Sequence, residues 1–242
     1  MPPSLVRYPT FLLLLATACV HASPVFHETF DSDYDRGQLV GQHGWEAWEK
    51  KPSSPVVYDT MGKVHPDFNW AVTCKARSSS DDFALKNIPA PKLEPDSKIV
   101  LEITAAREFH PQGAGNGVMF GLGSKVMDKA IGLGHLGVYF RDGWDSTVYA
   151  IDADGNNWNN FGSKEVVVLR SVWDLGANTA SLSIKNLSLG ETQFTPLYFD
   201  KEQTRTTVDL GPIGDFDSWN QVFIRTTGTK GAMLFDAKVS EE

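Results

Sequence analysis

The chain has 242 residues, with 30 acidic side chains against 22 lysines and arginines and a formal net charge of −8. An acidic chain without basic clusters argues against nucleic acid or an anionic membrane as the main partner. A chain of this length can bury a sizeable core, and its two cysteines exclude a disulfide-rich scaffold.

The first 22 residues have the composition of a signal peptide. Arg7 is the only charge before the apolar run 11–16, and Val20-His21-Ala22 gives a small-x-small cleavage site. The run is too short to span a bilayer, which needs about 20 apolar residues. Cleavage before Cys19 with lipid attachment is the alternative. We expect a leader over 1–22, one domain over 23–242, and a secreted or periplasmic protein, lipid-anchored at Cys19 under that alternative.

Removal of this leader would leave 30 acidic residues against 21 basic ones, a net charge of −9. Cys74 would then be the only cysteine, so no intrachain disulfide could form. We therefore expect stability to come from a packed core. No later segment is apolar enough for a transmembrane helix.

Strand-like runs rich in β-branched and aromatic residues follow one another to the C-terminus, and several alternate with period two. In chain order they cover 69–74, 82–86, 98–107, 117–122, 136–141, 147–152, 165–173, 180–185, 220–226 and 232–239. Only 124–130 could form about two helical turns, and a loop is the alternative there. Strands and helices do not alternate, which disfavours a parallel α/β sheet. We predict an all-β, antiparallel β-sandwich with a single domain.

The two ends of this sandwich carry a further pattern. Glu28-Thr29-Phe30-Asp31, Gly37-Gln38-Leu39 and Gly41-Gln42-His43-Gly44-Trp45 resemble the opening of secreted bacterial concanavalin A-like (laminin-G-like) jelly-roll domains. The segment 232–239 resembles their final strand, which pairs beside the first. The resemblance implies glycan binding, polysaccharide hydrolysis or lyase chemistry, or adhesion, and the fold alone does not choose among them. Trp45 and Trp48 are expected to pack the opening loop onto the core.

Glycoside hydrolases and polysaccharide lyases need different catalytic groups. Retaining glycosidases need two close carboxylates, and no strand here supplies such a pair, so a hydrolase is disfavoured. A polysaccharide lyase needs a group that neutralises the substrate carboxylate and a base beside it. Arg107, His110, Tyr139 and Arg141 are of the right types, and they would cluster if the strands 98–107 and 136–141 were neighbours. Surface packing of the same side chains is the alternative.

Two polar loops suggest a sugar-binding site. Flat aromatic rings stack on the apolar faces of sugars, and amides bind hydroxyls. The loops 142–145 and 152–160 contain such residues, namely Trp144, Asn157, Trp158 and Asn160. A structural role for the two tryptophans, capping the open edge of the sandwich, is the alternative.

Asp152, Asp154 and Asn156 form an oxygen-rich turn within the second loop. Hard cations favour such turns, so a structural calcium site is one interpretation and a plain Asp-Gly turn is the other. The histidines show no zinc-binding spacing. We therefore expect a non-catalytic exported module that binds a polysaccharide or cell-surface glycan through the 142–160 loops, with a lyase acting on uronate-containing polymers as the alternative.

Overall fold

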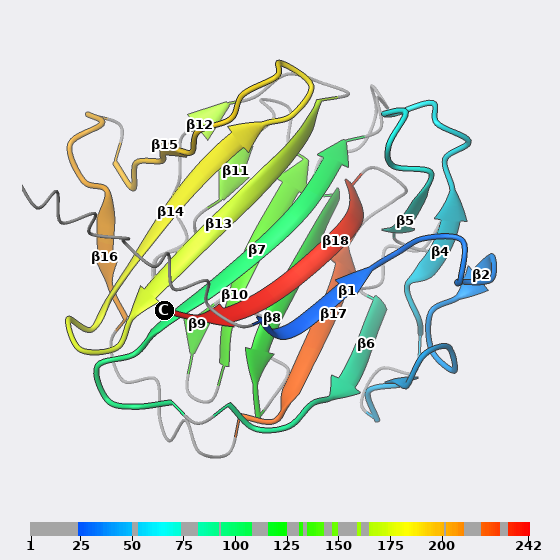
Figure 1. Ribbon diagram of the computed structural model, residues 1–242, viewed down its shortest axis with the longest axis horizontal. Coiled ribbons are helices and arrows are strands. Elements are labelled where there is room, and N and C mark those ends of the chain that lie inside the picture. Colours follow the sequence, from blue (N-terminus) through cyan, green and yellow to red (C-terminus); the bar gives the residue numbers. More distant parts are fainter. Residues whose placement is uncertain are drawn as a thin grey trace, which may run out of the picture.

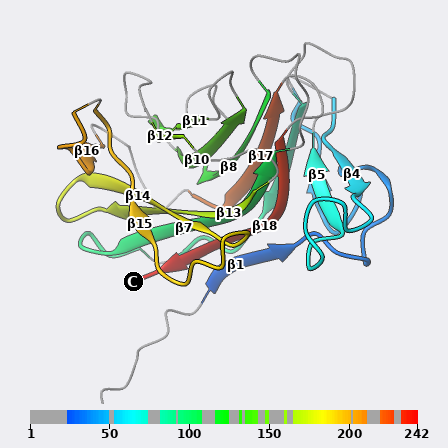
Figure 2. The ribbon, with the colours of Figure 1, turned by 90° about the horizontal axis from the view of Figure 1, so that it is seen from above.

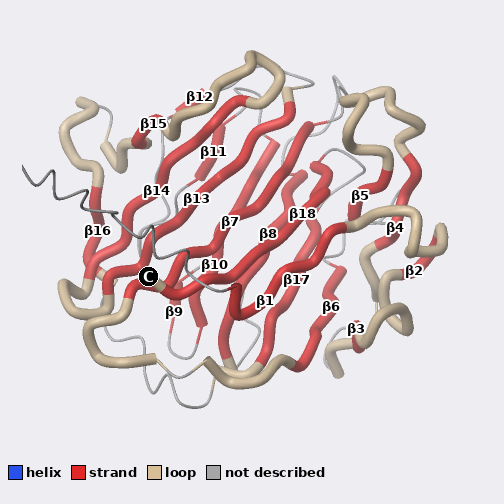
Figure 3. The backbone as a smooth tube through the Cα atoms, viewed as in Figure 1, coloured by secondary structure: helices blue, strands red, loops and turns tan. Residues whose placement is uncertain are grey.

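The computed structural model describes residues 24–49, 53–73, 82–91, 93–107, 116–124, 131–132, 135–142, 147–149, 159–160, 165–200, 202–210, 219–227 and 232–242. At 107, 116, 131–132, 135–142, 147–149, 159–160 and 227 this description covers the backbone only. Every regular element within these ranges is a β-strand (Figure 3). None of them is a helix of the length and apolarity that crossing a bilayer requires.

Ten strands form the larger sheet, sheet A. They are β1 Pro24–Thr29, β2 Gly37–Gln38, β4 Val56–Asp59, β5 Trp70–Thr73, β7 Lys98–Arg107, β13 Val166–Asp174, β14 Thr179–Asn186, β15 Thr195–Pro196, β16 Thr207–Asp209 and β18 Ala232–Glu241. Their order is β15-β14-β13-β7-β18-β5-β4-β2, with β1 also paired to β18 and β16 to β14. Figure 1 shows β13, β7 and β18 side by side at its centre.

Eight strands form the second sheet, sheet B. They are β3 Trp45–Glu46, β6 Asp82–Asn87, β8 Asn116–Gly123, β9 Ile131–Gly132, β10 His135–Asp142, β11 Thr147–Tyr149, β12 Asn159–Asn160 and β17 Gln221–Thr227. Their order is β12-β11-β10-β8-β17-β6-β3, with β9 also paired to β10. Figure 2 shows the two sheets as stacked layers. All recorded pairings in both sheets are antiparallel, so the predicted all-β antiparallel sandwich is confirmed.

The alternation of residues along each strand explains why the sheets stack. On β13, Val167, Leu169 and Trp173 face the core while Val168 and Arg170 face outward. On β8, Val118, Phe120 and Leu122 are fully buried in the same core. Burial of these side chains drives the layers together, because roughly 25 cal/mol is gained per Å² of apolar surface removed from water.

The first and last strands lie together in sheet A, as the resemblance implied. β1 runs antiparallel to β18, with His27 opposite Lys238 and Thr29 opposite Asp236. Phe30 continues the contact by donating its backbone N–H to the Phe235 carbonyl at 2.9 Å. Residues more than 200 positions apart are therefore paired in one sheet.

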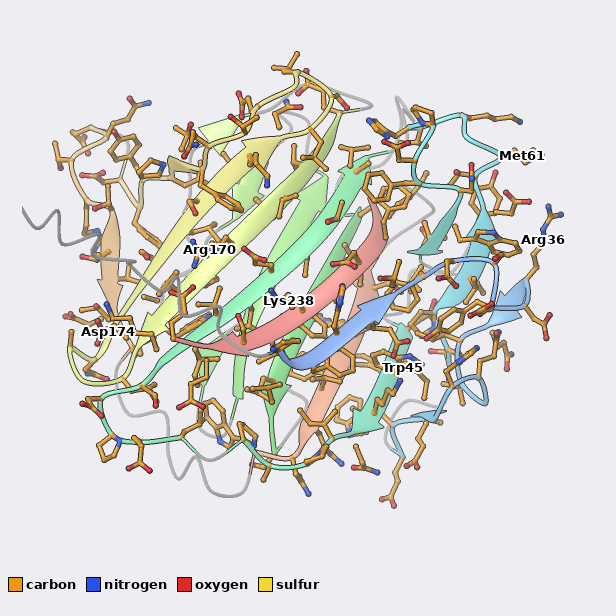
Figure 4. All side chains as sticks on the ribbon, viewed as in Figure 1. Arg36, Trp45, Met61, Arg170, Asp174 and Lys238 are labelled. Carbon is orange, nitrogen blue, oxygen red and sulfur yellow. The ribbon has the colours of Figure 1, made fainter. Side chains whose placement is uncertain are left out.

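The outer face of sheet A carries charges of both signs that pair with one another. Arg170 contacts Glu102 and Glu242, while Lys98 lies 3.4 Å from Asp174. Arg170, Asp174 and Lys238 mark this face in Figure 4. Exposed pairs contribute about 0–1 kcal/mol each, so their main effect is to leave the face close to neutral.

Candidate functional site

The opening motif forms a buried aromatic cluster between the sheets. Phe26 of β1 stacks on Phe120 at 5.8 Å and meets Trp45 edge-to-face at 6.5 Å. Trp45 is 1% exposed and donates its indole N–H to the Tyr34 hydroxyl at 3.2 Å. The prediction that Trp45 packs the opening loop onto the core is confirmed. The aromatic side chains of the opening motif therefore form part of the hydrophobic core.

An ion pair beside this aromatic cluster connects the two sheets. The Lys86 ammonium on β6 of sheet B contacts the Glu28 carboxylate on β1 of sheet A, and both side chains are largely buried. The ammonium also lies over the rings of Phe26 and Trp45, at 5.7 and 5.8 Å from their centroids. Charge attraction and cation–π contacts therefore join the first strand to the opposite sheet.

Tyr34 extends this network. Burial raises the pKa of its hydroxyl well above the ordinary value near 10, and the hydrogen bond and negative charge of Glu28 raise it further, while the Trp45 indole acts in the opposite direction. The His43 ring lies 4.3 Å from the Tyr34 ring. A phenol held this firmly in its neutral form is unsuited to act as a general base near neutral pH.

The raised pKa of Tyr34 predicts a pH dependence of stability. Below pH 10 the phenol is neutral in both states, and its hydrogen bonds stabilise the fold by about 1–3 kcal/mol. Above pH 10 the unfolded chain ionises first, so this contribution falls by about 1.4 kcal/mol per pH unit. In urea titrations, the difference in unfolding free energy between the wild type and Tyr34→Phe should stay constant up to about pH 9 and then narrow. A difference that grows with pH would contradict this assignment.

Trp48 also packs onto a fully buried side chain, but on the other side of sheet B from Trp45. Its half-buried ring packs 4.8 Å from Phe83, and Phe83 lies on the outer face of sheet B, not between the sheets. The alternation on β6 explains this, because Ala84 belongs to the inter-sheet core and its neighbour must face outward. Trp45 and Trp48 therefore contact opposite faces of the same sheet.

The outer face of sheet B forms regular cross-strand rows. In one row, Phe83 on β6 pairs with Arg225 on β17, which pairs with Met119 on β8. Met119 pairs in turn with Tyr139 on β10, and Tyr139 pairs with Tyr149 on β11. Register thus aligns an arginine position with three aromatic positions across five strands, but Phe83 and Met119 are 0% and 1% exposed, so these two side chains are not open to a ligand.

The expected clustering of Arg107 with Tyr139 and Arg141 required neighbouring strands, and that condition is not met. Arg107 ends β7 in sheet A, between β13 and β18, whereas the other two lie on β10 in sheet B. The chain crosses from sheet A to sheet B between β7 and β8, so Arg107 and the β10 residues belong to different sheets. His110 lies outside the described residues.

The predicted sugar-binding loops adjoin one edge of sheet B. Trp144, Asn157 and Trp158 lie outside the described residues, but the strands that flank them are described. Segment 143–146 joins β10 to β11, and 150–158 joins β11 to the edge strand β12, on which Asn160 pairs with Thr147. Both segments therefore start from the β10–β12 edge, and their role in binding stays a prediction.

The possible calcium ligands Asp152, Asp154 and Asn156 also lie outside the described residues. Within the described part of the chain, no group of three or more histidine, cysteine or acidic side chains could hold a metal ion. The calcium interpretation stays a prediction.

Two other partly exposed aromatic rings have cations over them. The Arg36 guanidinium lies 5.9 Å from the Trp70 ring centroid and pairs with Asp59, and this contact is the main cause of the lowered pKa of that carboxyl. On the outer face of sheet A, Lys185 lies 4.8 Å from the Phe194 centroid. These cations already occupy the rings that a sugar would need, which makes both weaker candidates than the loop tryptophans.

No protein-family model matches the chain, and no curated protein matches it significantly. Solved structures do. Lectin II from Ulex europaeus has a TM-score of 0.53 at 11% identity, covering 91% of this chain and 100% of the lectin. A carbohydrate esterase from the Shiga toxin-encoding bacteriophage phi24B has a TM-score of 0.54 at 12% identity, and the match covers 90% of this chain and 98% of the esterase chain. Peanut lectin with a 9mer peptide has a TM-score of 0.50 at 12% identity, and the match covers 90% of this chain and 96% of the lectin chain.

These likenesses extend over most of the chain and most of each neighbour, and at such low identity they establish the fold alone. The chain has the concanavalin A-like jelly-roll fold. The predicted fold class is confirmed.

Proposed function

We propose that this protein is an exported glycan-binding module, with the leader over 1–22 removed and the domain over 23–242 presenting the 142–160 loops to a polysaccharide or cell-surface glycan. The observation that carries the proposal is the junction of both tryptophan-containing segments with one edge of sheet B. There Trp144 and Trp158 would stack on sugar rings while Asn157 and Asn160 bind hydroxyls.

The likeness to lectins supports the same function. The Ulex lectin has also been solved in complex with galactose, and that structure has a TM-score of 0.52 to this chain. The resemblance of the opening motif to secreted domains supports export. The lyase alternative is not proposed, because Arg107 and Tyr139 belong to different sheets.

Replacing both Trp144 and Trp158 with alanine should abolish retention on a polysaccharide array. Each lost ring removes about 1–1.5 kcal/mol of aromatic contact, so affinity should fall by about 100-fold. The thermal midpoint should change little, because the proposal places both rings in loops that contact the ligand.

The matched control is Phe194→Ala, which removes a partly exposed ring from the outer face of sheet A. It should bind as the wild type does. Unaltered binding by the double variant would refute the proposal, and a large fall in its thermal midpoint would instead assign the tryptophans to the framework.

A further inference from the structure

The last two strands in chain order lie at the centre of the two sheets. In sheet A, β18 lies between β7 on one side and β5 and β1 on the other. In sheet B, β17 lies between β8 and β6. Figure 1 shows β18, in red, between the green β7 and the blue β1. The strands that connect the parts of each sheet are therefore the strands that the ribosome makes last.

Without these two strands, the described part of each sheet separates into smaller pieces. Sheet A would be left as β15-β14-β13-β7, with β16 beside β14, and a separate β5-β4-β2 piece. Among the described strands β1 pairs only with β18, so it would have no partner. Sheet B would be left as β12-β11-β10-β8, with β9 beside β10, and a two-stranded β6-β3 piece. Isolated two-stranded pieces are marginally stable at best in water, and each new edge exposes unpaired backbone groups.

Both strands also bury apolar side chains on each of their two faces. Val222 and Ile224 on β17 and Leu234 on β18 belong to the inter-sheet core. On the opposite faces, Phe223 and Phe235 are each 1% exposed. Burial of apolar surface is the main favourable contribution to folding, so a chain that lacks β17 and β18 is missing much of its driving force.

We propose that this strand order delays folding until the domain has been synthesised in full, and so keeps the chain able to cross a membrane unfolded. The inference rests on the proposed leader over 1–22, in which Arg7 is the single arginine, so the arginine pair of twin-arginine leaders is missing. At about 5–20 residues per second, residues 24–220 take roughly 10–40 s to synthesise. Throughout that time the leader can engage the export machinery while the chain behind it stays unfolded.

A circular permutant separates strand order from structure. In the β1–β18 pair Pro24 lies opposite Ser240, so a short Gly/Ser linker can join Glu242 to Pro24. New ends can be opened between Glu202 and Gln203, which are exposed residues between β15 and β16. In this order β17 and β18 are made early, and the edge strand β15 is made last.

The test fuses the leader 1–22 to both strand orders, expresses them in a bacterium and follows leader cleavage by pulse–chase labelling. The natural order should be exported and cleaved. The permutant should fold before export, so its uncleaved, protease-resistant fraction should be severalfold larger. Trp45→Ala in the permutant is the matched control, because it removes a buried core side chain and should weaken early folding and restore export.

Export of a stably folding permutant at the natural rate overturns the inference and leaves the proposed leader intact. A second measurement covers a permutant that does not fold. Protease added during synchronised synthesis of the natural-order chain should find no resistant fragment that ends before β17, and a resistant fragment containing 24–210 would overturn the inference. Failure of the natural-order chain to be cleaved and exported overturns the proposed leader, and the inference with it.

Discussion

Replacing Trp45 with alanine should lower the free energy of unfolding by about 3–5 kcal/mol, the usual loss for a large buried aromatic side chain. The ring is 1% exposed and contacts Phe26 and Phe30, at 6.5 and 6.4 Å between ring centroids. Its loss would also leave the Tyr34 hydroxyl without the indole hydrogen bond. Urea denaturation monitored by circular dichroism measures the effect.

Trp48→Ala is the matched control, from the same loop. Its ring is half-buried against Phe83 on the other face of sheet B, so the loss should be about 1–2 kcal/mol. Equal losses for the two variants would contradict the assignment of Trp45 to the inter-sheet core and Trp48 to the outer face.

Lys86→Met should lower the free energy of unfolding by about 2–4 kcal/mol, because it leaves the Glu28 carboxylate largely buried without its cation. Methionine keeps most of the apolar stem over Phe26 and Trp45, so the loss of stability should come mainly from removal of the positive charge. Glu28→Gln should cost less, since the amide still accepts a hydrogen bond.

The double variant Glu28→Gln/Lys86→Met decides whether the two groups act together. Once both charges are gone, stability should recover part of the way towards the wild type, with a coupling energy of about 1–3 kcal/mol. Strictly additive losses would show that the ion pair does not join the first strand to sheet B.

Strand positions were predictable from the sequence because their signal is local. The run 98–107 coincides with β7, and 232–239 lies within β18, since alternating β-branched residues specify a half-buried strand without reference to any partner. The predicted strand 147–152 ends at Tyr149 in the described part of the chain, and 150–152 lie beyond it.

Which strands become neighbours was not predictable in the same way. β7 pairs with β13 and β18, strands that begin about 60 and 125 residues later, so the separation of Arg107 from Tyr139 depends on crossovers and not on local pattern. The cross-strand row that contains Arg225 and Tyr139 was not predictable for a similar reason. The two residues share this row only because β17, β8 and β10 pair in this register.

The resemblance of the opening motif predicted the fold but not the site. Glu28 and Trp45, which carried that resemblance, proved to be buried partners of Lys86 and Tyr34. Residues that specify a fold through such contacts say little about what the fold binds.

The seven tryptophans allow a direct test of glycan binding at the β10–β12 edge. Indole N–H resonances of the nitrogen-15-labelled protein, assigned with single Trp→Phe variants, would be followed while a retained oligosaccharide is added. Trp144 and Trp158 should shift in a saturable manner, while the buried Trp45, Trp173 and Trp219 should not. Shifts confined to Trp70, or none at Trp144 and Trp158 under saturating ligand, would contradict binding at this edge.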